Sequence, residues 1–100
     1  MDQSVSVNGV FRALGDPTRR EILKLLRRRD MTAGEIADRF PLAKSTLSGH
    51  FNVLKHAGLI LAERQGTVIR YSLSQSAFEE GLAAVMDLLH AGKSGKERSS

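Results

Sequence analysis

The chain has 100 residues, of which 41% are hydrophobic, so it can bury one compact core without help from disulfides or a structural metal. It contains no cysteine, which excludes disulfide frameworks, thiolate metal sites and cysteine nucleophiles. The formal net charge of +4 favours a polyanionic partner.

No apolar run approaches the ~20 residues that a bilayer-spanning helix needs. The first ten residues also lack the basic start and apolar centre of a signal peptide. We therefore expect a soluble, cytoplasmic protein that does not insert into membranes. Basic residues concentrate in 12–29 and 44–71, whereas 74–90 is acidic. We therefore do not expect the last predicted helix to contact phosphate.

Two helices are predicted in the first third of the chain. Asp16 followed by Pro17 is a strong start for the second of them, because an N-cap acceptor precedes proline in the first turn. That helix should end near Arg29 or Asp30. The first, shorter helix is marked by apolar residues at helical spacing: Val7, Val10, Phe11 and Leu14.

A helix-turn-helix is predicted in the middle of the chain. Thr32 and Glu35 form a capping box that opens a third helix, which should run through Phe40 and be closed by Pro41. A fourth helix follows over 44–57, with Gly58 as its left-handed C-cap. Its core-facing stripe consists of Leu47, Phe51 and Leu54. The short turn between the two helices has the spacing of a helix-turn-helix.

A β-hairpin and a last helix complete the predicted domain. Residues 59–64 and 67–73 read as strands separated by Gln65-Gly66. Ser76 and Glu79 form a second capping box, which opens a helix with a wide apolar band. Residues 92–100 are polar and rich in Gly and Ser, so we expect a disordered tail after a single domain over 1–91.

The fourth predicted helix has an unusual outer face of small polar residues and a glycine. Glycine inside a helix costs about 1 kcal/mol relative to alanine, and Ser, Thr and Asn prefer caps and turns, so helix stability does not explain this face. Small hydrogen-bonding groups suit the major groove of DNA, and glycine permits closer approach. The alternative is that Ser45 and Thr46 belong to an ordinary first turn and that Ser48 and Gly49 are indifferent surface.

The hairpin favours the DNA interpretation. Its tip carries two guanidinium groups, and the predicted wing residues are Arg64, Gln65, Gly66, Thr67 and Arg70. A helix-turn-helix followed by a basic hairpin is typical of a winged helix, in which the helix enters the major groove and the wing contacts backbone or the neighbouring minor groove.

In these features the sequence resembles the ArsR/SmtB family of bacterial repressors, and within it the subgroup similar to the SdpR autorepressor. The resemblance rests on ALGDPTRREIL (13–23), MTAGEIA (31–37), STLSGHFNVLKHAGLI (45–60) and the set Arg64, Gly66, Tyr71 and Leu73, in unbroken order over about residues 9–90. It implies a mainly α fold of about five helices with a two-stranded β-hairpin wing, dimerising through the first and last helices.

The resemblance and the residue pattern together define the expected DNA contacts. The predicted reading residues are Lys44, Ser45, Thr46, Ser48, Gly49, His50 and Asn52. Thr32, at a helix N-terminus, is a candidate for a phosphate contact, although its capping role alone explains it. Ala43 departs from the family, because a capping serine is usual before the reading helix.

A homodimer is also expected from the residues themselves. The last helix has more apolar surface than one face of a small domain requires, and the first helix lacks an obvious partner. The predicted dimer interface consists of Val7, Val10, Phe11, Leu82, Val85, Met86 and Leu89. A two-fold dimer would place two reading helices ~34–36 Å apart, one turn of DNA.

The sequence departs from the family at the positions where relatives bind a regulatory metal. Many relatives sense metal through a cysteine pair in the third helix, but TAGEIAD (32–38) has no thiol. Other relatives bind zinc through acidic and histidine ligands, and the corresponding positions here carry residues that cannot serve as effective ligands: Gln75, Ala77, Leu88 and Ala91. We expect no metal and no other cofactor.

The sequence therefore predicts a homodimeric, sequence-specific DNA-binding repressor of the ArsR type on an inverted-repeat operator. An unidentified protein or small-molecule inducer is left open. The alternative is a winged helix that docks a protein partner instead of DNA. An enzyme is not expected, because the chain lacks a carboxylate pair, a nucleophile elbow and a phosphate-binding glycine loop.

Overall fold

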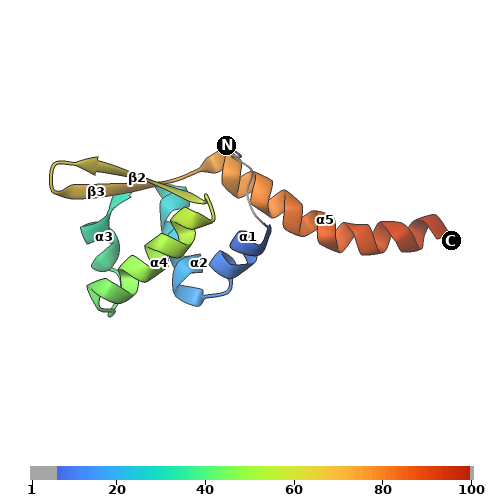
Figure 1. Cartoon of the computed structure of the whole chain (residues 1–100), viewed down its shortest axis with the longest axis horizontal. Helices are drawn as coiled ribbons and strands as arrows, with labels where there is room; N and C mark the ends of the chain where they lie inside the picture. Colours follow the sequence, from blue (N-terminus) through green and yellow to red (C-terminus); the bar gives the residue numbers. More distant parts are fainter. Residues whose placement is uncertain (1–6, 100) are drawn as a thin grey trace.

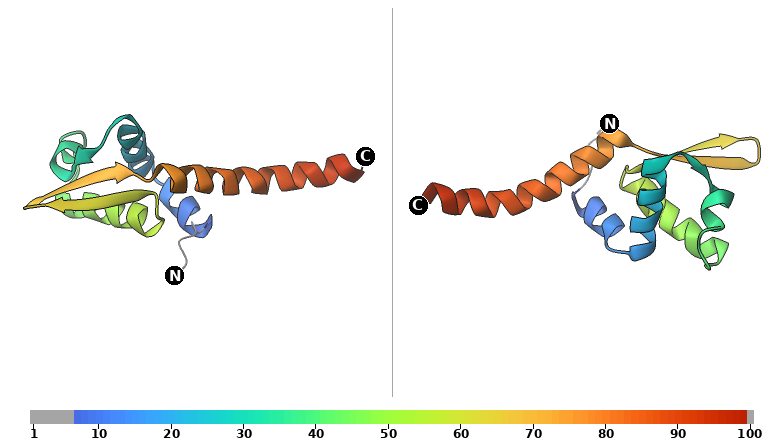
Figure 2. Two further views of the ribbon diagram at one scale, coloured as in Figure 1. Left: turned by 90° about the horizontal axis from the view of Figure 1, so that it is seen from above. Right: turned by 180° about the vertical axis from the view of Figure 1, so that it is seen from behind.

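The computed structural model describes residues 7–99, with side chains placed for residues 7–90. This part of the chain folds in the order α1 (Val7–Leu14), α2 (Pro17–Arg28), β1 (Met31–Thr32), α3 (Ala33–Ala37), α4 (Lys44–His56), β2 (Ile60–Gln65), β3 (Val68–Leu73) and α5 (Gln75–Ser99). The first four helices form a body beneath the sheet (Figure 1). Figure 2 shows that the β2–β3 hairpin and α5 project from opposite ends of this body.

The predicted start of α2 is confirmed. Asp16 adopts an extended conformation, and its Oδ2 accepts hydrogen bonds from the backbone N–H groups of Thr18 at 2.8 Å and Arg19 at 3.2 Å. Pro17 occupies the first helical position, where its missing N–H has no intrahelical partner to lose.

The capping box of α3 is also confirmed, but the helix is shorter than predicted. The Thr32 hydroxyl accepts from the Glu35 N–H at 3.1 Å, and the Glu35 carboxylate accepts from the Thr32 N–H at 2.9 Å. The helix ends at Ala37 and not at Phe40, because the N–H of Phe40 bonds the carbonyl three residues back, at Ala37, in a tighter turn.

The helix α4 ends as the sequence predicts. Gly58 has φ of +78°, its N–H bonds the Lys55 carbonyl at 2.9 Å, and the Leu59 N–H bonds the Leu54 carbonyl at 3.1 Å. These two bonds define a Schellman motif, in which the residue with positive φ is normally glycine. At the other end Ala43 makes no side-chain capping hydrogen bond, so the start of α4 depends on packing.

The hairpin is confirmed with its turn moved by one residue. The last cross-strand pair is Gln65 with Val68, so the turn is Gly66-Thr67 and not Gln65-Gly66. Gly66 has φ of +66°, and no other residue type in residues 7–99 has a positive φ. Glycine at the first turn position is what a type II′ turn requires.

The sheet has three strands, whereas the sequence predicts only the two of the wing. The two-residue β1 pairs with β3 in an antiparallel arrangement, Met31 opposite Tyr71 and Thr32 opposite Arg70, and the strand order is β1-β3-β2. A strand of two residues is too short to show alternation, so only its pairing with β3 reveals it.

The start of α5 differs in detail from the prediction. The helix begins at Gln75, one residue before Ser76, and the Glu79 carboxylate accepts from the Gln75 side-chain amide at 2.8 Å. The predicted second capping box is therefore wrong. The bounds of α5 include residues 92–99, expected as a disordered tail. The domain boundary at residue 91 stays a prediction, and the predicted domain start at residue 1 lies outside the described residues.

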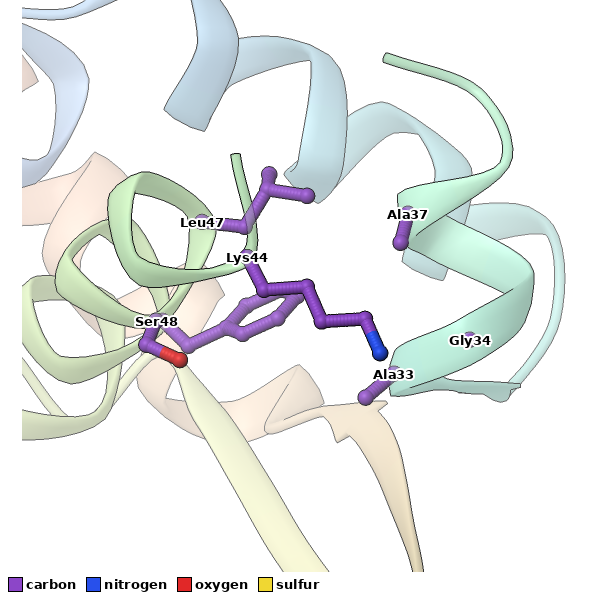
Figure 3. Close-up of a pocket in the computed structure, with 7 residues that line it drawn as sticks. Ala33, Gly34, Ala37, Lys44, Leu47 and Ser48 are labelled. Carbon is purple, nitrogen blue, oxygen red and sulfur yellow. The ribbon is translucent and has the colours of Figure 1, made fainter. Parts of the chain in front are cut away.

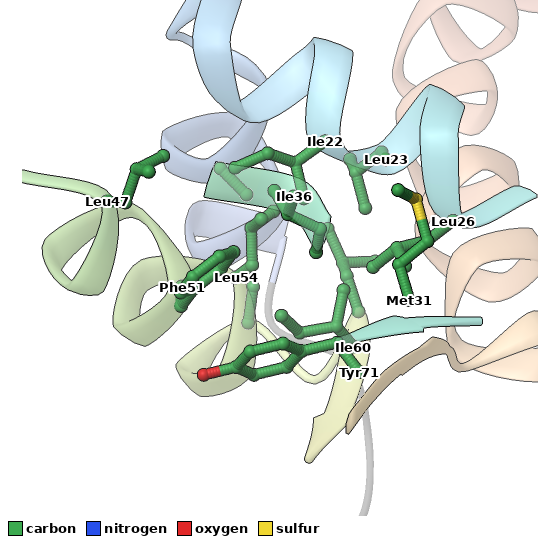
Figure 4. Close-up of a cluster of buried hydrophobic side chains, with 13 residues drawn as sticks. Ile22, Leu23, Leu26, Met31, Ile36, Leu47, Phe51, Leu54, Ile60 and Tyr71 are labelled. Carbon is green, nitrogen blue, oxygen red and sulfur yellow. The ribbon is translucent and has the colours of Figure 1, made fainter. Parts of the chain in front are cut away.

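The core lies between α4, α2 and the sheet. Leu47, Phe51 and Leu54 are buried, as predicted, and Figure 4 shows them directed from α4 into the hydrophobic cluster. The Phe51 ring stacks on the Tyr71 ring of β3 with centroids 4.4 Å apart. This contact joins α4 to the wing. Within residues 7–99, no helix is long and apolar enough to span a bilayer.

The two glycines of α4 and its cap give opposite predictions for stability. Gly58→Ala should lower the free energy of unfolding by about 1–2 kcal/mol, because alanine disfavours a positive φ although space is available for its Cβ. Gly49→Ala, whose Cβ also meets nothing within 4 Å, should raise it by about 0.5–1 kcal/mol because the site is helical. Urea unfolding at one fixed protein concentration compares the pair. Equal midpoints for all three proteins would contradict both assignments.

Candidate nucleic-acid interface

The outer face of α4 is open to solvent. Its inner stripe is buried, and the predicted reading residues that are exposed are Lys44, Ser45, Thr46, Ser48, Gly49 and Asn52. A Cβ built on Gly49 meets no atom within 4 Å, so the glycine is not required for packing inside the protein. The helix thus presents short polar groups and one position without a side chain on a rigid, well-anchored element.

A shallow apolar cleft of about 210 Å³ separates α3 from α4. It is lined by Ala33, Gly34, Ala37, Lys44, Leu47, Ser48 and Phe51. Figure 3 shows the Lys44 chain extending from α4 across this cleft toward Ala33. The ammonium group of Lys44 therefore lies between the two helices of the helix-turn-helix, beside the outer face of α4.

The wing brings only part of its predicted set to one surface. Arg64, Gln65, Gly66 and Thr67 are exposed. Arg64 pairs with Ile69, so neighbouring Arg70 lies on the opposite face of the hairpin, because successive side chains alternate along a strand. Arg64 shares the face of Tyr71, which stacks on α4, whereas Arg70 pairs with Thr32. The expectation of two guanidiniums at one tip is therefore corrected.

Arg70 and Thr32 belong to a small polar group around the start of α3. The Arg70 Nε donates a long hydrogen bond of 3.5 Å to the Gln65 side-chain oxygen. The backbone N–H of Thr32 chiefly holds the pKa of Glu35 below its ordinary value, although partial burial raises it, and the positive charges of Arg29 and Arg70 lower it further. The Thr32 hydroxyl accepts from the Glu35 N–H, and a hydrogen bond from the same hydroxyl to the Glu35 carboxylate also lowers the pKa of Glu35.

His50 is set apart from the other predicted reading residues. Its side chain is only 16% exposed and lies on the flank of α4 that faces α2. There Nε2 lies 3.8 Å from Asp16 Oδ2, and Nδ1 lies 3.1 Å from Arg19 Nη1. The sequence marks Asp16 as a cap, but it contains no signal for the contact of Arg19 with His50, because the two residues lie 31 positions apart.

The predicted dimer interface is exposed in part. The residues with large exposed apolar side chains are Phe11, Leu82, Met86 and Leu89, and the last reaches 61%. Val7 and Val85 are partly buried. Val10 is only 2% exposed within the single chain, so it packs inside the protein and has no surface left for a partner, which corrects that assignment.

Metal-binding groups do not gather in the part of the chain that the structure describes. No set of three or more His, Cys, Asp or Glu residues there is arranged to hold an ion. Four positions were predicted to correspond to the zinc ligands of relatives. Gln75 and Leu88 are exposed and Ala77 is partly buried, while the side chain of Ala91 lies outside the described residues.

Comparison with known proteins places the helix-turn-helix in a family. Residues 16–61 match the model of the bacterial regulatory protein, arsR family. The transcriptional repressor SdpR of Bacillus subtilis (strain 168) is 42% identical over 86 residues, which cover 86% of this chain and 96% of that protein.

Solved structures of ArsR-family regulators also resemble this chain. An ArsR family transcriptional regulator superposes with a TM-score of 0.78 at 32% identity, covering 88% of this chain and 91% of that one. The homodimeric winged helix-turn-helix DNA-binding domain of Mb0332 from Mycobacterium bovis superposes with a TM-score of 0.66 at 30% identity, covering 85% and 81%.

The Asp16 cap predicts a specific dependence of stability on pH. Partial burial raises the pKa of Asp16, but the backbone N–H groups of Arg19 and Thr18 and the charge of His50 outweigh it and hold the pKa below its ordinary value. The ionised carboxylate therefore contributes stability that is complete above about pH 4 and is lost as the pH falls through the lowered pKa.

Asp16→Asn provides the matched control, because asparagine caps a helix as well as aspartate but does not titrate. In thermal unfolding between pH 2.5 and 6, wild type should be more stable than Asp16→Asn at the upper end, and this difference should disappear only at the acidic end. A constant difference across this range would contradict the role of the carboxylate.

Proposed function

Because the chain belongs to the ArsR family of bacterial regulatory proteins and is a winged helix-turn-helix transcriptional regulator, we propose that it represses transcription as a homodimer on an inverted-repeat operator. The observation that carries this proposal is the outer face of α4, whose short polar groups are exposed while its inner stripe is fully anchored. Occupation of a promoter by such a dimer would exclude the transcription machinery.

In the proposed complex, α4 enters the major groove. Ser45, Ser48 and Asn52 can exchange hydrogen bonds with base edges, and Gly49 gives the backbone room to approach. Lys44 and Thr46 are placed to contact the flanking backbone. Each of these groups is short or flexible, so the depth to which the helix enters the groove decides which bases are read.

The wing adds contacts with no base preference. Arg64 lies on the face of the hairpin that carries Tyr71 against α4, so we assign it the main phosphate or minor-groove contact. Gln65, Gly66 and Thr67 follow it at the tip. Arg70 and Thr32, on the other face, are proposed as secondary backbone contacts.

The dimer is proposed to form through α1 and α5. The exposed side chains of Phe11, Leu82, Met86 and Leu89 support this, since large apolar groups gathered on two adjacent helices are typical of an interface. The relative from Mycobacterium bovis is described as homodimeric. We propose a cytoplasmic location as well, because that is where a bacterial DNA partner lies. We further propose that repression does not depend on a metal.

Dependence on salt tests the polyanionic partner. A dimer making ~6–10 phosphate contacts should lose about 10³–10⁵-fold in operator affinity between 50 and 200 mM salt. Arg64→Ala should weaken binding to every duplex and flatten this slope, because one neutralised phosphate per protomer is lost. Fluorescence anisotropy with operator and with random duplex measures both effects. Salt-insensitive binding, or no duplex binding, would instead favour the docking of a protein partner.

The outer face of α4 is tested by two substitutions of small residues. Ser48→Ala should cost about 1–3 kcal/mol of operator binding and leave nonspecific binding nearly unchanged, because a hydroxyl that contacts base edges is removed. Gly49→Ala should weaken operator binding while stabilising the free protein. Ser76→Ala, exposed on α5, is the matched control and should leave both affinities unaltered. The assignment fails if operator affinity is the same in all four proteins.

A further inference from the structure

The position of His50 within α4 differs from that of its neighbours. Ser48, Gly49 and Asn52 are exposed, whereas the His50 side chain is 16% exposed and is enclosed against the first turn of α2. A group that reads bases must reach the groove with its ring nitrogens. Both ring nitrogens of His50 instead face groups of the protein itself.

Arg19 is the centre of these contacts. Its Nη1 lies 3.1 Å from His50 Nδ1, its Nε donates to the Ala13 carbonyl at 3.1 Å, and its Nη2 donates to the Arg12 carbonyl at 2.6 Å. One guanidinium therefore satisfies two carbonyls at the end of α1 and reaches the middle of α4. The positive charge also suits the negative end of the α1 dipole.

The chemistry of Arg19 decides the tautomer of His50. A guanidinium has donors and no acceptor, so in the neutral imidazole ring Nδ1 is the acceptor and carries no proton. The proton of the neutral ring is then on Nε2, which faces the Asp16 carboxylate at 3.8 Å. Asp16 is itself held in place as the cap of α2.

We propose that His50 is a positioning residue that, through Arg19 and Asp16, fixes the orientation of α4 on α1 and α2, and that it does not read bases. The proposal deepens the proposed function and rests on it. Two observations give the contact its importance. The start of α4 has no side-chain cap, and α1 carries Phe11 of the proposed dimer interface. The contacts among Asp16, Arg19 and His50 thus connect the proposed reading helix α4 to α1, which through the dimer interface would set the separation of the two half-sites.

The DNA-free test is ¹⁵N NMR of the His50 ring. Wild type should show an unprotonated Nδ1 and a protonated Nε2, and Arg19→Ala should shift the ring toward the other tautomer. A protonated Nδ1 in wild type would overturn the proposal, whether or not the protein binds DNA.

The DNA test compares His50→Ala with His50→Asn, whose side-chain oxygen can replace Nδ1 as an acceptor for Arg19. The alanine variant should lose about tenfold in operator affinity, the size expected for one hydrogen bond to a charged group, and asparagine should restore most of it. The alanine variant should also discriminate less between operators whose half-site spacing differs by one base pair. The half-site sequence selected from a random duplex pool should stay the same.

Three outcomes contradict the positioning role. The first is a changed base preference in His50→Ala, and the second is an operator affinity of this variant equal to that of wild type. The third is a loss of affinity in the Arg19→Ala, His50→Ala double variant equal to the sum of the two single losses, because coupled residues should give a smaller loss. If wild type selects no operator, the proposed function fails, but NMR of the His50 ring still tests the contact of His50 with Arg19.

Discussion

The stacking of Phe51 on Tyr71 is the contact on which the rest of the structure depends. It joins the inner side of α4 to the central strand of the sheet, with ring centroids 4.4 Å apart. Tyr71 pairs with Ala62 of β2 on one side and Met31 of β1 on the other, so a single aromatic pair connects α4 to all three strands. Burial of the Tyr71 ring raises the pKa of its hydroxyl, which agrees with its place in the core.

This anchoring explains why the outer face of α4 can carry poor helix formers. Leu47, Phe51 and Leu54 bury the inner stripe, and the Schellman motif at Gly58 closes the helix. Tertiary packing, not intrinsic propensity, supplies most of the stability of such a helix. The outer positions are therefore free to hold Ser45, Ser48 and Gly49. In the same way, the pairing of β2 with β3 holds the wing in register, and its tip need not contribute to the core.

Much of the fold could be predicted because its signals are local. The cap at Asp16, the capping box at Thr32 and the left-handed residue at Gly58 each involve atoms within a few positions in the chain. The apolar stripe of α4 needed only the helical period. Prediction was less accurate where the local sequence allowed more than one turn or helix start. The turn of the hairpin lies one residue later than expected, and Ser76 with Glu79 does not form the second capping box.

The sequence by itself determined the five helices and the two strands of the hairpin, their order, the buried stripe of α4 and the family, because short-range spacing and motif order carry this information. Only the tertiary structure decided which faces these elements share. Pairing of β1 with β3 made a third strand, the register of the hairpin separated Arg64 from Arg70, and packing of α4 on α2 turned His50 toward Arg19. Packing likewise placed Val10 in the core and not on the predicted dimer surface. The pairing of β1 with β3 and the contact of His50 with Arg19 join residues far apart in the chain, which no local pattern records, and the register of the hairpin follows from where its turn lies.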